Sequence, residues 1–208
     1  MKAMSKNSKK YMPTYIIIAL NIIFYVYTSI FGGDFITTGD SAIFLFGQVN
    51  YCVIYYGWYW QLFTSMFVHV TVVHLLGNMF FLLIFGLRAE ELFSLKEYLL
   101  IYFLSGLAGN LLTLLFGLDM VSAGASGAIF GMFGACTIYF RRAIGQSIMS
   151  ALVYAFFLLM ISSGPSVNVF AHLGGLAVGL LIGYVLGATR RRSVTHTYEY
   201  RYSFSPRG

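Results

Sequence analysis

Charged side chains are scarce in this chain of 208 residues, at 10% of the sequence. A soluble domain carries roughly 25%. No lysine or arginine occurs between Lys10 and Arg88, and hydrophobic residues make up 59% of the chain. This composition argues against a soluble domain and predicts an integral membrane protein built as one compact bundle.

Cysteine is also rare, and the two cysteines, Cys52 and Cys136, have no metal-ligand spacing. We therefore expect no disulfide framework, no metal site and no cofactor. The formal charge of +6 would suit a nucleic-acid partner, but we expect none, because the basic residues form clusters between apolar runs. The clusters are Lys2 to Lys10, Arg88 with Lys96, Arg141 with Arg142, Arg190 to Arg192, and Arg201 with Arg207.

Six stretches approach the roughly 20 mostly apolar residues that a membrane helix needs, although some are short. The first follows a lysine cluster and lacks a small-x-small cleavage site, so we expect a retained span rather than a removed signal peptide. The expected fold is all-α, with a basic N-terminus at residues 1–12, a six-helix membrane domain at residues 13–188 and a polar tail at residues 189–208. The stretches are Pro13 to Phe31, Leu62 to Leu87, Lys96 to Phe116, Ala125 to Phe140, Ser147 to Ile161 and Val169 to Ala188.

The basic clusters also predict an orientation. Six spans place both termini on one side, and a cytoplasmic N-terminus puts every basic cluster on the cytoplasmic side. We therefore expect a multi-pass protein of the cell membrane with both termini cytoplasmic. The first outer segment, from Gly32 to Gly57, is long and rich in aromatic residues, which suits the membrane–water interface. A short seventh span is the alternative.

Four polar residues interrupt the apolar spans. His74 and Asn78 are four residues apart and share one helix face. Ser126 opens the fourth span, and His172 lies about one turn into the sixth. Polar side chains are costly in hydrocarbon and usually face the interior of a bundle. If the second span begins near Leu62, His74 and Asn78 lie three to four turns into it, although a later start would bring them level with the other two.

These residues have a structural interpretation and a catalytic one. Histidine and asparagine often join helices by hydrogen bonds, and a serine beside glycines often allows close packing. Tight packing of the fourth span on the sixth would also bring Ser126 and His172 within hydrogen-bond reach. A neutral imidazole can then take the serine proton, and His74, Asn78 and backbone N–H groups at the helix start can stabilise an oxyanion. No acid is placed to orient the base, so the pair would be a dyad.

Three motifs in separate spans together resemble the rhomboid intramembrane serine proteases in their basic six-helix form: "HxxxN" from His74 to Asn78, "GASG" around Ser126, and "AHLGG" around His172. The resemblance covers about Gly57 to Gly187. It implies that Ser126 is the nucleophile, that His172 is the base, and that His74, Asn78 and the Ser126 N–H line an oxyanion hole. It also implies cleavage of single-span membrane proteins in or near their transmembrane segments, at an active site towards the extracytoplasmic side of the bilayer.

Other positions extend the resemblance or depart from it. In the family, the position of His69 lies near the active site without doing chemistry, and the loop from Ser162 to Asn168 corresponds to a lid. Gln61 stands where the family often has arginine, which puts the anchoring of the first outer segment in doubt. Phe130 stands where a tyrosine often packs on the base. Glu90 matches an acid that holds the cytoplasmic end of the second helix, and a solvated loop charge is the alternative.

Two other functions are compatible with a polar site in a helical bundle. A non-enzymatic member of the fold would bind membrane proteins and have no use for the dyad, whereas Ser126 and His172 are both present. A small transporter or channel would need a polar path across the bilayer, whereas the polar groups gather near one face and no acid lies deep in a span. The sequence favours neither a monomer nor a dimer.

Overall fold

The computed structural model describes residues 12–32, 34–143, 147, 149, 153 and 167–190. Most of this part of the chain is helical, and two short strands form an antiparallel pair. The elements are α1 (Pro13–Gly32), α2 (Asp40–Phe46), β1 (Gln48–Val49), α3 (Asn50–Tyr56), α4 (Gln61–Thr64), η1 (Ser65–Phe67), α5 (Val72–Leu92), α6 (Leu95–Thr113), η2 (Leu114–Phe116), β2 (Val121–Ser122), α7 (Ser126–Ala143) and α9 (Val169–Thr189).

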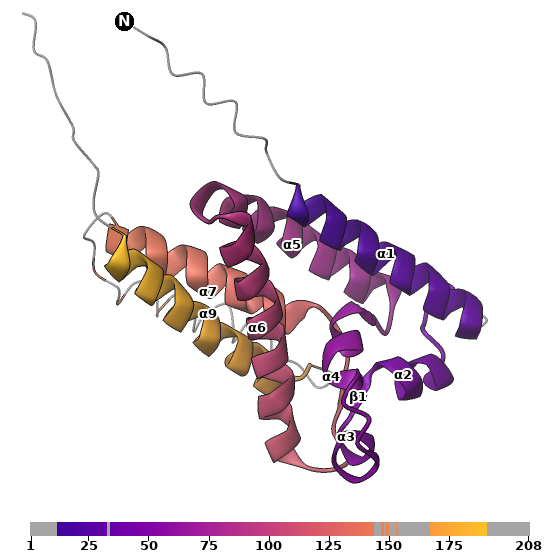
Figure 1. The fold of residues 1–208 in the computed structure, drawn as a ribbon. Coiled ribbons are helices and arrows are strands. Elements are labelled where there is room, and N and C mark those ends of the chain that lie inside the picture. The colour runs from indigo at the N-terminus through magenta and orange to yellow at the C-terminus, as the bar shows by residue number, and fades with distance from the viewer. Residues whose placement is uncertain are drawn as a thin grey trace, which may run out of the picture.

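The long helices pack in a continuous series (Figure 1). α9 lies along α7, α6 packs against both, and α5 packs between α7 and α1. The short elements α2, β1, α3 and α4 gather near the C-terminal end of α6. Among the described elements, the long helices reach across the bundle, and the short elements form a cap at one end of it.

The distribution of polar and apolar side chains on α1 is the reverse of that in a water-soluble protein. Asn21 and Thr28 are fully buried, whereas Ile16, Ile23 and Ile30 are 60%, 64% and 67% exposed. Such a surface is stable only in an apolar solvent, where polar groups turn inward to find partners. Four described helical segments are long and apolar enough to cross a membrane: α1, α5, α6 with η2, and α9. The predicted helical, multi-pass membrane fold is confirmed at that level.

Most predicted spans correspond closely to observed helices. Pro13 to Phe31 corresponds to α1, Lys96 to Phe116 to α6 with η2, and Val169 to Ala188 to α9. Ala125 to Phe140 corresponds to α7, which contains several small residues and two arginines and is not among the four most apolar helices. The predicted span Ser147 to Ile161 lies outside the described residues except at positions 147, 149 and 153.

The predicted start of the second span at Leu62 is wrong, because α5 begins ten residues later. The chain forms α4 and η1 first, and then runs extended to Thr71. The Thr71 hydroxyl accepts a hydrogen bond of 3.1 Å from the backbone N–H of His74 and so caps the first turn of α5. The intervening stretch is apolar because Met66 and Val68 are fully buried, so its composition resembles that of a span.

The alternative of a seventh span in the first outer segment is excluded by the lengths of its helices. α2 and α3 have seven residues each, and a membrane helix needs about 20. Between them, β1 pairs with β2, so that Gln48 lies opposite Ser122 and Val49 opposite Val121. This pairing attaches the first outer segment to the chain that leads into α7.

Glycines allow α9 to approach α7 with backbone against backbone. Gly175, Gly179 and Gly183 of α9 face the carbonyl groups of Gly127, Gly131 and Ala135 on α7, with no space for a Cβ atom between them. On the α6 side, Gly109 faces the carbonyl of Ala171 in the same way. The first turns of α9 are therefore enclosed by two helix backbones, as small-xxx-small surfaces permit in membranes.

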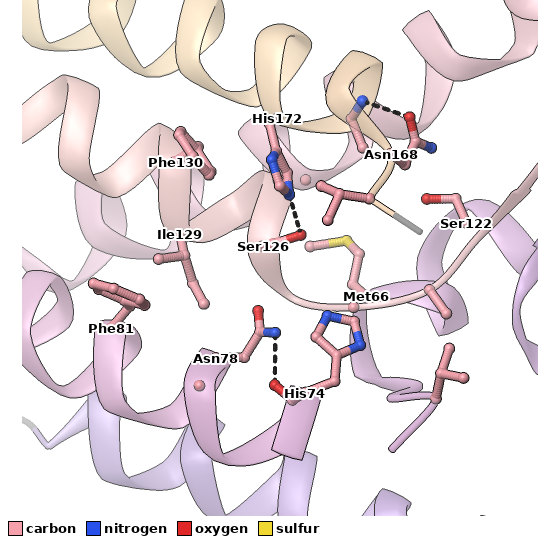
Figure 2. A pocket seen from close by; sticks show the side chains of 18 of the residues that line it. Met66, His74, Asn78, Phe81, Ser122, Ser126, Ile129, Phe130, Asn168 and His172 are labelled. Carbon is pink, nitrogen blue, oxygen red and sulfur yellow. Dashed lines mark hydrogen bonds between the residues drawn. The ribbon is translucent and has the colours of Figure 1, made fainter. Parts of the chain in front are cut away.

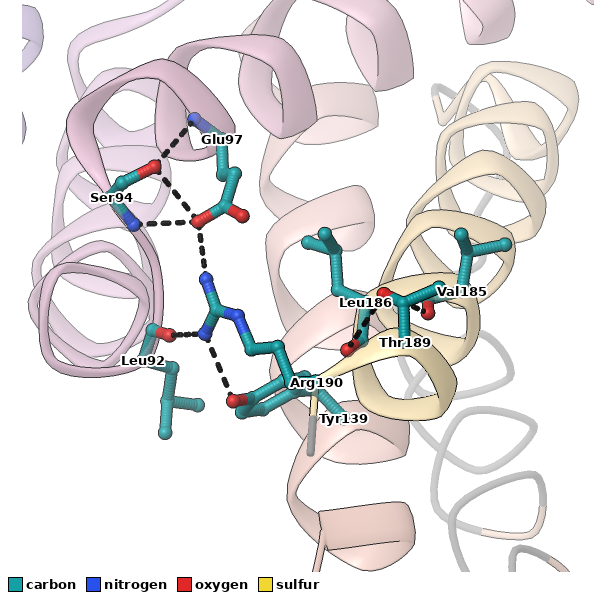
Figure 3. Close-up of polar contacts among 8 residues, drawn as sticks. All are labelled: Leu92, Ser94, Glu97, Tyr139, Val185, Leu186, Thr189 and Arg190. Carbon is teal, nitrogen blue, oxygen red and sulfur yellow. Dashed lines mark hydrogen bonds and ion pairs between the residues drawn. The ribbon is translucent and has the colours of Figure 1, made fainter. Parts of the chain in front are cut away.

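The end of the bundle where α6 begins and α9 ends is joined by polar contacts (Figure 3). The Arg190 guanidinium, just after α9, donates to the Leu92 carbonyl at 2.6 Å and to the Tyr139 hydroxyl at 2.9 Å, and forms an ion pair with Glu97. At the same end, a Glu90 carboxylate oxygen accepts from the backbone N–H of Thr14 at 2.9 Å. Glu90 therefore connects the end of α5 to the start of α1 and is not a solvated loop charge.

We predict that Arg190→Met lowers the free energy of unfolding by about 1–2 kcal/mol. The substitution removes three contacts of a charged donor, each of which is weakened by partial exposure. Thermal unfolding in one detergent measures the effect, with Arg207→Met in the C-terminal tail as the matched control. Equal melting temperatures for the two variants would contradict the prediction.

Candidate active site

A cavity of about 650 Å³ lies where α5, α7 and α9 begin (Figure 2). Its lining includes all four predicted site residues, His74, Asn78, Ser126 and His172. Because α5 begins at Val72, His74 and Asn78 fall in its first two turns. The later start of α5 therefore brings both side chains to the level of Ser126 and His172.

Ser126 and His172 form a hydrogen bond, with 2.8 Å between the Ser126 Oγ and the His172 Nε2. Ser126 is the first residue of α7, and His172 is the fourth residue of α9. The turn before Ser126 requires Gly124, whose φ of +130° is rarely adopted by other residues. The Gly124 N–H donates to the Ser65 carbonyl at 2.9 Å, which fixes this turn against η1.

The His172 ring is held by packing on one face. The Phe130 ring stacks on it, with 4.4 Å between centroids and 20° between planes. The Nδ1 atom of His172 is buried and has no hydrogen-bond partner among the described residues. Phe130 thus keeps the stacking surface expected of the family's tyrosine. No described carboxylate orients the base, so the observed arrangement is a pair rather than a triad.

His74 and Asn78 lie across the cavity from His172 (Figure 2). The His74 ring packs against Gly124, where an added Cβ would be 3.0 Å from Cε1 and 3.1 Å from Nε2. The Asn78 side-chain amide donates to the His74 carbonyl at 2.9 Å, which leaves its second N–H available. Both side chains line the same cavity as Ser126, and the Asn78 Oδ1 is buried with no hydrogen-bond partner among the described residues.

His69 lies in the connection before α5. It packs against His74 and makes no hydrogen bond to Ser126. Its ring meets that of His74 edge to face, at 5.2 Å between centroids. Burial, with a smaller effect of the neighbouring His74, lowers the pKa of His69 to about 3. The ring is therefore neutral near pH 7. The Thr38 hydroxyl holds its backbone by donating to the His69 carbonyl at 2.6 Å.

Gln61 anchors the first outer segment. The family often has arginine at this position, and the sequence had therefore put the anchoring in doubt. The buried Gln61 amide donates to the Phe44 carbonyl at 2.7 Å, and its oxygen accepts from the Val49 N–H at 2.9 Å. Trp60 adds a bond from its ring N–H to the Leu45 carbonyl at 3.1 Å. Through β1 and β2, this anchor is continuous with the turn before Ser126.

Two residues that position the site were missed at the level of sequence. Thr71 caps α5, and the Asn168 side chain caps α9 by accepting from the Ala171 N–H at 3.1 Å. Threonine and asparagine are both preferred N-cap residues. The sequence therefore contained a signal for these two caps, but it could be recognised only once the first residues of α5 and α9 were known. Among the described residues, no three histidine, cysteine or acidic side chains gather closely enough to hold a metal ion.

Fold and site together define a polytopic helical membrane protein with a serine–histidine pair at the start of two packed helices. A Rhomboid domain model matches residues 56–189. The chain belongs to the rhomboid family, and the family predicted from its motifs is confirmed.

Several relatives carry rhomboid names. The mitochondrial RHOMBOID-like protein 6 of Arabidopsis thaliana is 38% identical over 133 residues, covering 61% of this chain and 43% of that protein. In Bacillus subtilis (strain 168), the putative rhomboid protease YdcA is 35% identical over 142 residues, covering 65% of this chain and 71% of that protein. Rhomboid protease GluP is 31% identical over 184 residues, covering 84% and 34% respectively. This chain spans less than half the length of the Arabidopsis relatives.

Proposed function

We propose that this protein is an intramembrane serine endopeptidase that uses Ser126 and His172 as its catalytic dyad. The observation that carries the proposal is the 2.8 Å contact between Oγ and Nε2 inside a cavity at membrane-helix ends. A serine hydroxyl is a weak nucleophile until a neighbouring base accepts its proton. Family membership and two relatives named as proteases support the same activity.

In the proposed reaction, the Ser126 Oγ attacks the carbonyl carbon of a substrate peptide bond, and His172 Nε2 takes the hydroxyl proton. The carbonyl oxygen becomes an oxyanion in a tetrahedral intermediate. As the carbon–nitrogen bond breaks, the imidazolium returns the proton to the leaving amine and an acyl-enzyme remains. A water molecule then repeats the sequence, giving a carboxylic acid and free Ser126.

The oxyanion would be stabilised by donors from two helices. His74 and Asn78 supply side-chain N–H groups, and Ser126 supplies a backbone N–H at the start of α7, where no intrahelical acceptor exists. In addition, α5, α7 and α9 all begin at the cavity, so the positive ends of three helix dipoles meet there. Preorganised dipoles of this kind stabilise developing negative charge without reorganising.

The proposed setting is a cell membrane that the chain crosses six times, with the basic termini cytoplasmic. Residues 13–188 would form the membrane domain, with residues 1–12 and 189–208 outside it. The site would then face the extracytoplasmic side and receive water from there. Single-span membrane proteins are the proposed substrates, because a site at membrane-helix ends reaches peptide bonds in or near a transmembrane segment.

Reconstitution with a tagged single-span protein in lipid vesicles tests this function. We expect two fragments, with the cut located by mass spectrometry in or beside the span. We also expect a fluorophosphonate to label Ser126 covalently. If several single-span substrates stay intact and the probe leaves Ser126 unlabelled, the protease proposal fails.

A further inference from the structure

We propose that Asn168 and Thr113 form a positioning pair that sets the height and rotation of the first turn of α9, and thereby holds the His172 Nε2 at the Ser126 Oγ. This inference rests on the proposed function, because it assigns the pair a role in the catalytic step. Thr113 lies at the end of α6, and Asn168 immediately precedes α9. The side-chain hydrogen bonds of the two residues go to Gly109, Ala171 and each other, and none of them goes to Ser126.

The Asn168 side chain uses both ends of its amide. Its oxygen accepts from the Ala171 N–H at 3.1 Å, and its nitrogen donates to the Thr113 hydroxyl oxygen at 2.9 Å (Figure 2 labels Asn168). The backbone carbonyl of Asn168 also accepts from the His172 N–H at 3.3 Å. Asn168 is therefore bonded directly to the backbone of His172 and of the residue before it.

The Thr113 hydroxyl is itself fixed. Thr113 is fully buried, and its hydroxyl donates to the Gly109 carbonyl at 2.9 Å, so a lone pair of the same oxygen receives the Asn168 amide. The Asn50 side chain donates to the Thr113 backbone carbonyl at 2.8 Å. The acceptor for Asn168 is therefore a rigid point on α6 rather than a mobile surface hydroxyl.

The contacts of α9 with α7 set how closely the two helices approach. Gly175 and Gly179 lie against the α7 backbone, and the Leu176 side chain between them packs with Phe130. In a serine protease triad, the carboxylate of an aspartate accepts a hydrogen bond from the Nδ1 of the histidine and so fixes the orientation of the ring. Here His172 Nδ1 has no partner among the described residues. Ring placement therefore depends on stacking with Phe130 and on the position of the helix itself.

Four variants separate the helix cap from the connection to α6. Asn168→Ala removes both, whereas Asn168→Ser keeps an N-cap oxygen and is too short to reach Thr113. Thr113→Val keeps the cap and removes the connection together with the bond from the hydroxyl to the Gly109 carbonyl, and Thr113→Ser restores the hydroxyl. Initial rates in lipid vesicles give kcat and KM, and fluorophosphonate titration gives the concentration of folded, reactive enzyme to which kcat is referred.

We expect kcat to fall about 100-fold in Asn168→Ala and about tenfold in both Asn168→Ser and Thr113→Val, with KM within twofold, because a misplacement of about 1 Å can cost 10²-fold. Thr113→Ser should restore kcat to within twofold of wild type. A purely structural cap would lower the melting temperature and leave kcat per reactive enzyme unchanged, and that result would overturn the proposal. Equal kcat values for Thr113→Val and Thr113→Ser would also overturn it. If the wild-type protein neither cleaves nor reacts, the proposed function fails instead.

Discussion

Alanine at Ser126 or at His172 is expected to lower turnover by about 10⁶-fold, which is the loss measured when the nucleophile or base of a soluble serine protease is removed. The two losses should be equal, and the double variant should be no slower than either single one. Ser126 without an imidazole holds its proton, and the imidazole without Ser126 has nothing to activate. Residues that act as one unit lose their contribution together.

Product formation from a tagged single-span substrate in vesicles measures this loss. Ser193→Ala and His196→Ala, in the C-terminal tail, are the matched controls and should cleave at the wild-type rate. A second readout is covalent labelling, which should disappear in Ser126→Ala and become far slower in His172→Ala. If His172→Ala retained even a tenth of wild-type turnover, another group would have to serve as the base.

The second large effect is expected from a single methyl group on α9. In Gly175→Ala, the added Cβ would lie 2.7 Å from the Gly127 carbonyl carbon and 3.1 Å from its Cα. Both atoms belong to the backbone of α7 and cannot turn aside. The helices must separate beside Ser126, and we expect turnover to fall about 10²-fold or more, with a stability loss of about 1–3 kcal/mol.

Gly187→Ala is the matched control on the same helix. The atoms nearest to its added Cβ belong to the Arg142 side chain, with Cβ at 3.2 Å and Cγ and Cδ at 3.5 Å, and a shift of a few tenths of an ångström relieves such contacts. It should therefore keep wild-type turnover and nearly the wild-type melting temperature. The comparison is made per reactive enzyme after fluorophosphonate titration. Wild-type turnover in Gly175→Ala would show that the separation of α7 and α9 does not control the reaction.

Sequence patterns predicted the long apolar helices well where polar residues flank them. α1 and α9 were placed within a residue or two, because their apolar runs end at polar or charged residues. The start of α5 was misplaced because buried loop residues such as Met66 are as apolar as residues that face lipid. β1 and β2 went unpredicted, since two-residue strands carry no periodic pattern.

The residues of the candidate site were easier to predict than their supports. Ser126, His172, His74 and Asn78 stand out because polar side chains are rare in apolar spans, and all four line one cavity. Asn168 and Thr71 do not stand out, because polar residues are ordinary in connecting segments. The importance of Asn168 also depends on a partner that is distant in the chain, Thr113, and a single sequence does not reveal such pairings.

The pairing of β1 with β2 also bears on the order of events during synthesis. Gln48 finds its partner Ser122 only after α5 and α6 have been made, so the turn before Ser126 is formed late. His172 follows Ser126 by another 46 positions. A nascent chain thus exposes the proposed oxyanion donors first, the nucleophile next and the base last. By the proposed mechanism, a newly made chain cannot cleave its neighbours at the ribosome until α9 has entered the bundle.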